Sequence, residues 1–316
     1  MNAAIACLAV ITAPCLAVAH PDHASESDQP QRRRPPRQSA PAELPPSAVS
    51  ITVEGDHRVI RANGLPEHET GAFPNPGNPN ALRAQQHVYR IPANPQIADA
   101  LTTARPEFGI AINGVIFDAG TAEFWSPSGR RFGARSDWNH EAIGGSLDLG
   151  LDEHNAHVQP TGKYHYHGPP AGLIAELDSG DAMTLIGWGF DGFPIYAARG
   201  HADPNDPDSP LMTLTPSYRP KQGERPAPPD GPGGAFDGSY TADWEYVQGL
   251  GDLDEANGRH GVTPEFPDGT YYYVVTGEFP YVPRFWRGTP DESLTRRGPN
   301  RGAGRGERQR PGRSPR

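Results

Sequence analysis

One stretch, Asn155 to Gly168, constrains the fold of this chain more than any other. It reads Asn-Ala-His-Val-Gln-Pro-Thr-Gly-Lys-Tyr-His-Tyr-His-Gly. Its end, Tyr164 to His167, alternates strictly between tyrosine and histidine. Alternation with a period of two is typical of a β-strand whose two faces differ. The pattern therefore predicts a strand with His165 and His167 on one face and the two tyrosines on the other.

A tight turn in the middle of this stretch sets which residues face each other. Pro160-Thr161-Gly162 suits a three-residue hairpin loop, because proline presets the first turn position and glycine takes the left-handed position. In this register His157 lies opposite His165, and Asn155 lies opposite His167. A loop one residue longer would shift the pairing and remove His157 from the cluster. The hairpin thus predicts three imidazoles on one face.

Three imidazoles on one hairpin face are a candidate metal site. His165 and His167 are two residues apart on one strand, and His157 joins them from the paired strand. Three protein ligands leave one coordination position open, which is the arrangement of catalytic zinc sites. Imidazole suits copper equally well. The alternative is that these histidines are polar surface residues, or form a hydrogen-bond network with the tyrosines.

The chain resembles the YHYH domain family, a group of mostly secreted or periplasmic proteins of poorly defined function. The resemblance begins with the quartet Tyr164–His167 and extends over roughly Ile51 to Glu292. Further blocks that resemble the family are Asn63–Pro66 with Thr70-Gly71, Asn113–Val115 with Phe117-Asp118, Leu185–Trp188 with Asp191–Tyr196, Gly251–Glu255, Thr263–Glu265 with Pro267–Tyr271, and Phe279–Tyr281. The resemblance implies a location outside the cytoplasm, but it implies little about activity.

Asp191 is the candidate catalytic residue. It stands in Gly189-Phe190-Asp191-Gly192-Phe193, where flanking glycines allow close backbone approach and aromatic neighbours indicate burial. A buried carboxylate needs a partner. Asp191 is therefore a candidate fourth ligand, a candidate hydrogen-bond acceptor for an imidazole N–H, or a candidate general base. The alternative is an Asp-Gly turn between two strands.

A second candidate metal site is rich in oxygen ligands. The segment Gly251 to Gly258 crowds such ligands at short spacing, as calcium loops do. Ala256 stands where a third oxygen ligand is wanted, and flanking helices are not evident, so the segment is not an EF-hand. The candidate calcium ligands are Asp252, Asp254, Glu255 and Asn257. The alternative is an acidic turn.

The remaining pattern predicts a mainly β fold. Asn113-Gly114 between two apolar runs, Phe108 to Asp118, is a strong hairpin signal, and Gly55-Asp56 separates another pair of short strands. Long amphipathic helices are missing, and Ala171 to Leu177 is long enough for only one or two helical turns. Glycine and proline number 37 each. We expect one antiparallel sandwich or open-barrel-like domain with long Pro/Gly-rich loops and few short helices.

The two ends of the chain predict targeting and disorder. Residues 1–19 are small and apolar and end in Ala-Val-Ala, as a secretory signal peptide does. We expect residues 20–47 to form a disordered linker and residues 295–316 to form a disordered basic tail. The YHYH-like domain is expected to span residues 48–294 between them. No interior run is long enough to span a membrane. We therefore expect a secreted or periplasmic protein.

Charge limits the partners of the domain. The linker and tail hold 12 of the 28 basic residues but only 5 of the 38 acidic ones, so the domain between them is strongly acidic. This argues against nucleic acid as its partner and leaves a small molecule or a protein. We expect a monomer by default. The first hypothesis is metal storage, delivery or metal-dependent hydrolysis, and the second is an extracellular interaction module, metal-free or calcium-stabilised. Whether the protein is an enzyme stays open.

Overall fold

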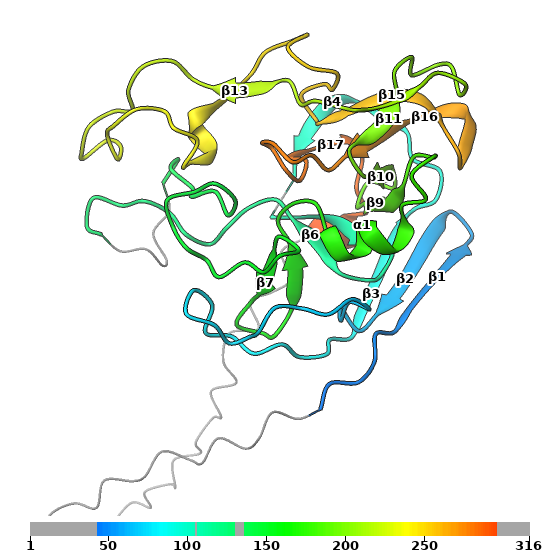
Figure 1. The fold of residues 1–316 in the computed structure, drawn as a ribbon, viewed down its shortest axis with the longest axis horizontal. Coiled ribbons are helices and arrows are strands. Elements are labelled where there is room, and N and C mark those ends of the chain that lie inside the picture. Colours follow the sequence, from blue (N-terminus) through cyan, green and yellow to red (C-terminus); the bar gives the residue numbers. More distant parts are fainter. Residues whose placement is uncertain (1–42, 105, 130–135, 296–316) are drawn as a thin grey trace, which may run out of the picture. The chain divides into compact units, whose positions relative to one another are not determined.

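A computed structural model describes residues 43–104, 106–129 and 136–295 of the chain. All strands and helices belong to the unit Leu44–Arg316. The predicted signal peptide (1–19), the linker up to residue 42 and the tail after residue 295 lie outside the described residues, so these segments stay predictions. Strands dominate the described part of the chain, which confirms the mainly β class (Figure 1).

The largest sheet has eight strands and an open order, from β15 at one edge to β7 at the other. Its members in spatial order are β15 (Gly258–Thr263), β16 (Phe266–Val274), β10 (Pro194–Tyr196), β9 (Leu185–Gly189), β5 (Glu107–Ala111), β6 (Ile116–Asp118), β8 (Tyr164–Tyr166) and β7 (Ala156–Val158). The predicted hairpin over Phe108–Asp118 is confirmed as β5 and β6.

This main sheet is mixed, although antiparallel pairing was expected. β6 pairs parallel with β8, and β10 pairs parallel with β16. Two neighbouring parallel strands need a long crossover connection, which carries the chain back to the end of the sheet where the first strand began. Long loops provide such connections here, because the chain runs from β6 to β7 through residues 119–155 with isolated bridges as its only pairing among the described residues.

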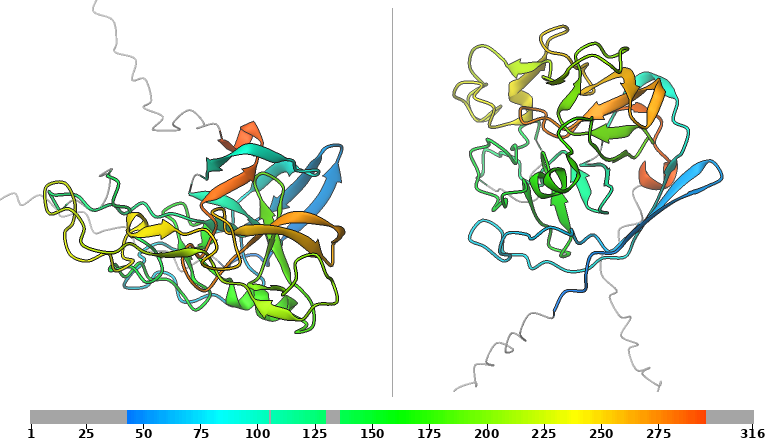
Figure 2. Two further views of the ribbon diagram at one scale, coloured as in Figure 1. Left: turned by 90° about the horizontal axis from the view of Figure 1, so that it is seen from above. Right: turned by 45° about the vertical axis from the view of Figure 1, so that its right-hand side comes forward.

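Smaller sheets of two or three strands accompany the main one (Figure 1, Figure 2). The expected hairpin around Gly55 is confirmed, since β1 and β2 form an antiparallel pair that β3 extends. Bounds of the remaining elements are β1 (Val49–Glu54), β2 (His57–Ala62), β3 (His87–Pro92), β4 (Ile97–Thr103), β11 (Arg199–His201), β12 (Leu211–Thr213), β13 (Tyr218–Pro220), β14 (Trp244–Tyr246), β17 (Phe285–Gly288), α1 (Ala171–Leu177), η1 (Thr241–Asp243) and α2 (Glu292–Thr295).

The core lies against the tyrosine face of the histidine strand. Tyr164 and Tyr166 are fully buried, and they belong to one apolar cluster with Ile110, Phe117 and Ile186. Full burial of a large apolar side chain contributes about 1.5–3 kcal/mol to stability. The hairpin that carries the histidines is therefore fixed from one side by the main core. Among the described residues no helix has the length and apolar character needed to span a membrane.

Candidate metal centre

The predicted histidine hairpin forms with the predicted register. β7 and β8 pair antiparallel, with His157 directly opposite His165. The turn closes through a bond from Gln159 N to Lys163 O (2.9 Å) and one from Gly162 N to Gln159 O (2.8 Å). Gly162 has φ +90°, a left-handed conformation that glycine adopts without strain. The three-residue turn therefore fixes which histidine faces which.

The third histidine lies just beyond β8. The N–H of His167 donates to the carbonyl of Asn155 (2.7 Å), which extends the ladder by one step. Asn155 has φ +56°, and its side-chain amide donates to the carbonyl of Pro169 (2.8 Å). Asn155 thus lies opposite His167 as predicted, and its side chain holds the neighbouring backbone.

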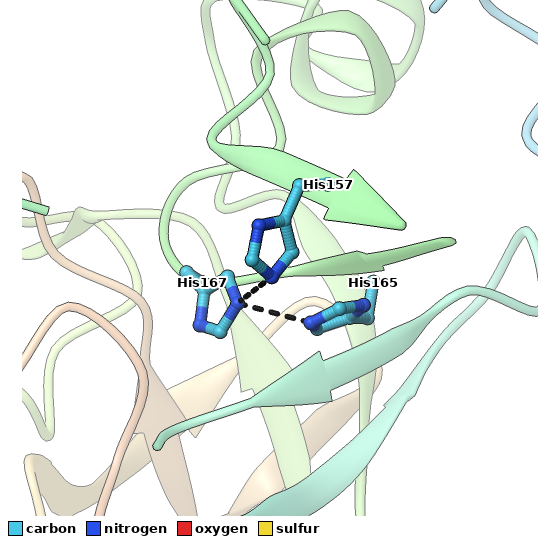
Figure 3. A group of neighbouring side chains, drawn as sticks. All are labelled: His157, His165 and His167. Carbon is cyan, nitrogen blue, oxygen red and sulfur yellow. Dashed lines mark hydrogen bonds between the residues drawn. The ribbon is translucent and has the colours of Figure 1, made fainter. Parts of the chain in front are cut away.

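The three imidazoles converge on one point (Figure 3). Nε2 of His167 lies 3.1 Å from Nε2 of His157 and 3.0 Å from Nε2 of His165. One ligand nitrogen from each ring lies within 4.8 Å of the others, and no other group of three potential ligands from His, Cys, Asp or Glu occurs among the described residues. Nitrogens bound to a tetrahedral ion at about 2.0–2.1 Å lie about 3.3 Å apart. The spacing is close to that of a three-histidine metal site.

Main-chain carbonyls orient all three rings. Nδ1 of His157 bonds to the carbonyl of Leu149 (2.8 Å), and Nδ1 of His165 to that of Lys163 (3.3 Å). The carbonyl of Asp118, on the adjacent strand β6, hydrogen-bonds the His167 ring. Because a carbonyl only accepts, Nδ1 of His157 and Nδ1 of His165 carry the proton, and each of these neutral rings then has a bare lone pair on Nε2.

Burial keeps these rings neutral. Only 2% of His165 and 5% of His167 is exposed. Burial lowers the pKa of both imidazoles well below the ordinary value, and the neighbouring histidines lower it further. Burial also lowers the pKa of His157. The neutral rings therefore turn their Nε2 atoms toward each other, and dashed lines in Figure 3 join Nε2 of His167 to Nε2 of His157 and of His165.

The tyrosines of the quartet anchor the opposite face of the strand. The hydroxyl of Tyr164 donates to the Asp152 carboxylate (2.6 Å). The Tyr166 hydroxyl accepts from the side-chain amide of Asn113 (2.9 Å) and bonds to Nε2 of His68 (2.8 Å). The period-two alternation of the strand thus puts the candidate ligand nitrogens on one face. The tyrosines, whose hydroxyl groups hydrogen-bond to neighbouring segments, lie on the other face.

Asp191 lies in a buried network at the turn between β9 and β10. Its carboxylate accepts from the Tyr273 hydroxyl (2.5 Å) and from the backbone N–H of Gly288 (2.8 Å). Burial raises its pKa to about 6. Its hydrogen-bond partners among the described residues do not include the three histidines. The role of Asp191 as a general base stays a prediction.

The four candidate calcium ligands turn toward different partners. Asp252 accepts from the backbone and hydroxyl of Thr215 (2.8 Å each), and Asp254 accepts from the Tyr271 hydroxyl (2.9 Å). The Asn257 amide donates to a β16 carbonyl (2.8 Å), and Glu255 accepts a bond through its main chain. The structure does not bring these side chains together as a ligand group. Calcium binding at this segment stays a prediction.

The contacts that orient the imidazoles could not be predicted from the sequence. Leu149, Lys163 and Asp118 act through their main-chain carbonyls, which every residue type carries, so no residue type signals them. The parallel pairing of β6 with β8, which places Ile116 beside His165, has no local signature either. It is this pairing that brings the Asp118 carbonyl to the third imidazole.

The fold and the site define a mainly β protein with a buried three-histidine cluster on an edge hairpin. The model of the protein family described as YHYH protein matches residues 88–288. This range covers most of the chain and includes all three histidines, and the chain belongs to the YHYH family. No curated protein and no solved structure matches the chain.

Proposed function

We propose that the protein binds a transition metal, zinc or copper, through Nε2 of His157, His165 and His167. One observation carries the proposal: Nε2 of His167 lies 3.0–3.1 Å from the Nε2 atoms of His157 and His165, and main-chain carbonyls hydrogen-bond Nδ1 of His157, Nδ1 of His165 and the ring of His167. A buried acceptor without a donor costs about 1–3 kcal/mol. A cation between the three nitrogens satisfies all of them at once.

The donor set narrows the choice of metal. Three neutral imidazoles suit zinc and copper, whereas calcium and magnesium prefer oxygen ligands. Carbonyl bonds to the imidazole rings are the outer-shell contacts that metal-bound histidines usually have. Since the rings are already oriented in the folded chain, binding needs little rearrangement. Convergence of the histidines favours metal binding over the alternative of a metal-free interaction module.

Three protein ligands leave a coordination position for another group. A bound metal at such a site supplies Lewis-acid or water-activating chemistry, which fits hydrolysis, and it equally fits storage or delivery. The chain's own contribution is to orient three neutral nitrogens and to keep solvent away from two of them. A secreted or periplasmic location, which the first nineteen residues predict, belongs to the same proposal.

Elemental analysis of purified protein tests the proposal. We expect about one zinc or copper ion per chain in the wild type and a strong loss in His165→Ala. His260→Ala is the matched control, because His260 is exposed on β15 and takes no part in the cluster. If His165→Ala does not fold, His157→Ala at the half-buried position is measured in its place. Equal metal content in the histidine variants and the wild type overturns the proposal.

A further inference from the structure

A hollow of about 460 Å³ opens beside the histidine cluster. Its lining has four polar residues, Glu107, Asp118, Gln159 and Ser293, and three apolar ones, Pro106, Phe190 and Leu294. Ligand pockets commonly have volumes of about 300–1,000 Å³ and combine apolar walls with a few polar groups. In size and lining this hollow suits a small organic ligand.

The hairpin places this hollow next to the three imidazoles. Gln159 faces Lys163 in the register that puts His157 opposite His165. Because side chains alternate with a period of two, Lys163 and Gln159 lie on the histidine face of the hairpin. Two residues along a strand span about 7 Å. A ligand in the hollow would therefore lie one residue pair away from the cluster.

Two carboxylates oppose each other in the hollow. Glu107 of β5 and Asp118 of β6 are direct cross-strand partners, and like charges in that relation repel. The Lys163 ammonium contacts Glu107 and forms an ion pair with it. Asp118 is 3% exposed, and within the described part of the chain its carboxylate accepts only from the backbone N–H of Gly120 (3.2 Å) and the Gln159 amide (3.3 Å).

The two carboxyl groups of this hollow differ in their partners. Lys163 pairs with Glu107, whereas no ion pair involving Asp118 occurs among the described residues, and the charges of Lys163 and Arg284 act on Asp118 without direct contact. Burial raises the pKa of Asp118 to about 7. Buried charges are ordinarily paired. A positive group between the two carboxylates would relieve their repulsion and pair with Asp118.

We propose that the hollow binds a primary amine with a small apolar body, with its ammonium between the Asp118 and Glu107 carboxylates. The apolar half of the lining, Phe190 and Leu294 among it, is what selects an organic cation. A hydrated divalent ion has no use for an apolar wall, whereas the body of an organic cation can pack against it. The amine site goes beyond metal binding and does not depend on it.

Calorimetric titration with benzylamine at about pH 8 tests the proposal. We expect saturable binding to wild type and a 10- to 100-fold loss of affinity in Asp118→Asn, in keeping with charged hydrogen bonds of about 1.5–3 kcal/mol. The bond to His167 comes from the Asp118 main chain, so this substitution leaves the histidine cluster in place. Benzyl alcohol, the neutral counterpart, is expected to bind weakly to both proteins.

Three controls distinguish binding of the amine in the hollow from metal binding at the histidines and from binding of any cation. Asp208→Asn removes an exposed carboxylate that accepts no hydrogen bond from the described residues, and it should leave affinity unchanged. His165→Ala should retain benzylamine binding even as it loses metal, so failure of either proposal can be told from failure of the other. Magnesium chloride is added as an inorganic cation that could compete with benzylamine. Equal affinity of wild type and Asp118→Asn, equally tight benzyl alcohol, or competition by magnesium overturns the amine site.

Discussion

His157 and His165 lie directly opposite each other across the β7–β8 hairpin, with ring centroids 4.7 Å apart. A directly opposed pair places two imidazoles close enough for a third ring to meet both. His167, two residues further on, is that ring, and its Nε2 contacts the Nε2 of each of the other two. The convergence depends on a hairpin register that a three-residue turn specifies.

Substituting the turn glycine should therefore damage both stability and metal binding. Gly162 has φ +90°, and an added Cβ would lie 2.5 Å from the Arg83 side chain. We expect Gly162→Ala to lower the free energy of unfolding by about 1–2 kcal/mol in urea titrations. Displacement of Lys163, whose carbonyl orients His165, should weaken metal binding by about 10- to 100-fold.

Gly180→Ala is the matched control for this substitution. Gly180 has a similar φ of +85°, but an added Cβ there meets no atom within 4 Å. It should lose similar backbone stability and keep its metal affinity. Equal metal affinities in both variants would contradict the claim that the turn sets the ligand geometry.

Zinc should stabilise the folded protein through the histidine cluster. A ligand that binds only the native state at about 100 times its Kd adds about 2.7 kcal/mol to the free energy of unfolding. We expect the melting temperature of metal-free protein to rise on addition of zinc, and a chelator to reverse the rise. The shift should vanish in His157→Ala and persist in His260→Ala. A shift of the same size in both variants would place the ion elsewhere.

The hairpin could be predicted from the sequence because its determinants are local. Pro160-Thr161-Gly162 fixes the loop length, and alternation assigns His165 and Tyr164 to opposite faces. The Asn113-Gly114 turn between β5 and β6 was predictable for the same reason. In each case a few neighbouring residues specify the geometry.

Long-range pairing could not be predicted in this way. The parallel contact of Ile116 with His165 depends on the path of a long connection, and no residue in either strand encodes it. The surroundings of Asp191 show the same limit, since Tyr273 and Gly288 come from distant segments. The sequence indicated a buried carboxylate that needs a partner, whereas the identity of that partner required the fold.

Removal of one tyrosine hydroxyl should cost stability but leave metal binding intact. Tyr164 donates to Asp152 (2.6 Å), which also accepts from the backbone N–H of Gly71 and of His154. Hydrogen bonds to charged groups contribute about 1.5–3 kcal/mol, so Tyr164→Phe should lower the free energy of unfolding by that amount. Metal content should stay at the wild-type level, because Tyr164 lies on the other face of the strand.

Tyr246→Phe is the control for the lost hydroxyl, since the Tyr246 hydroxyl makes no hydrogen bond to the described residues. Its free energy of unfolding should change by less than about 0.5 kcal/mol. Loss of metal in Tyr164→Phe with normal folding would mean that the tyrosine face also shapes the metal site.

The buried Asp191 should make stability depend on pH in a defined direction. Burial raises its pKa from 3.8 to about 6, so between these values the native state holds a proton that the unfolded state has released. The free energy of unfolding therefore falls as pH rises through this window, by at most about 1.4 kcal/mol per pH unit from this group.

Asp191→Asn removes this component. Tyr273 O–H and Gly288 N–H both donate to Oδ2 of Asp191, and Phe193 N–H donates to Oδ1 (3.4 Å). Because an amide has only one oxygen, its NH2 group must face one of these donor sets, so the variant should also lose about 1–3 kcal/mol. Urea titrations between about pH 4 and 7 should give a flatter profile for Asp191→Asn, and a profile parallel to that of wild type would show that this carboxyl titrates normally.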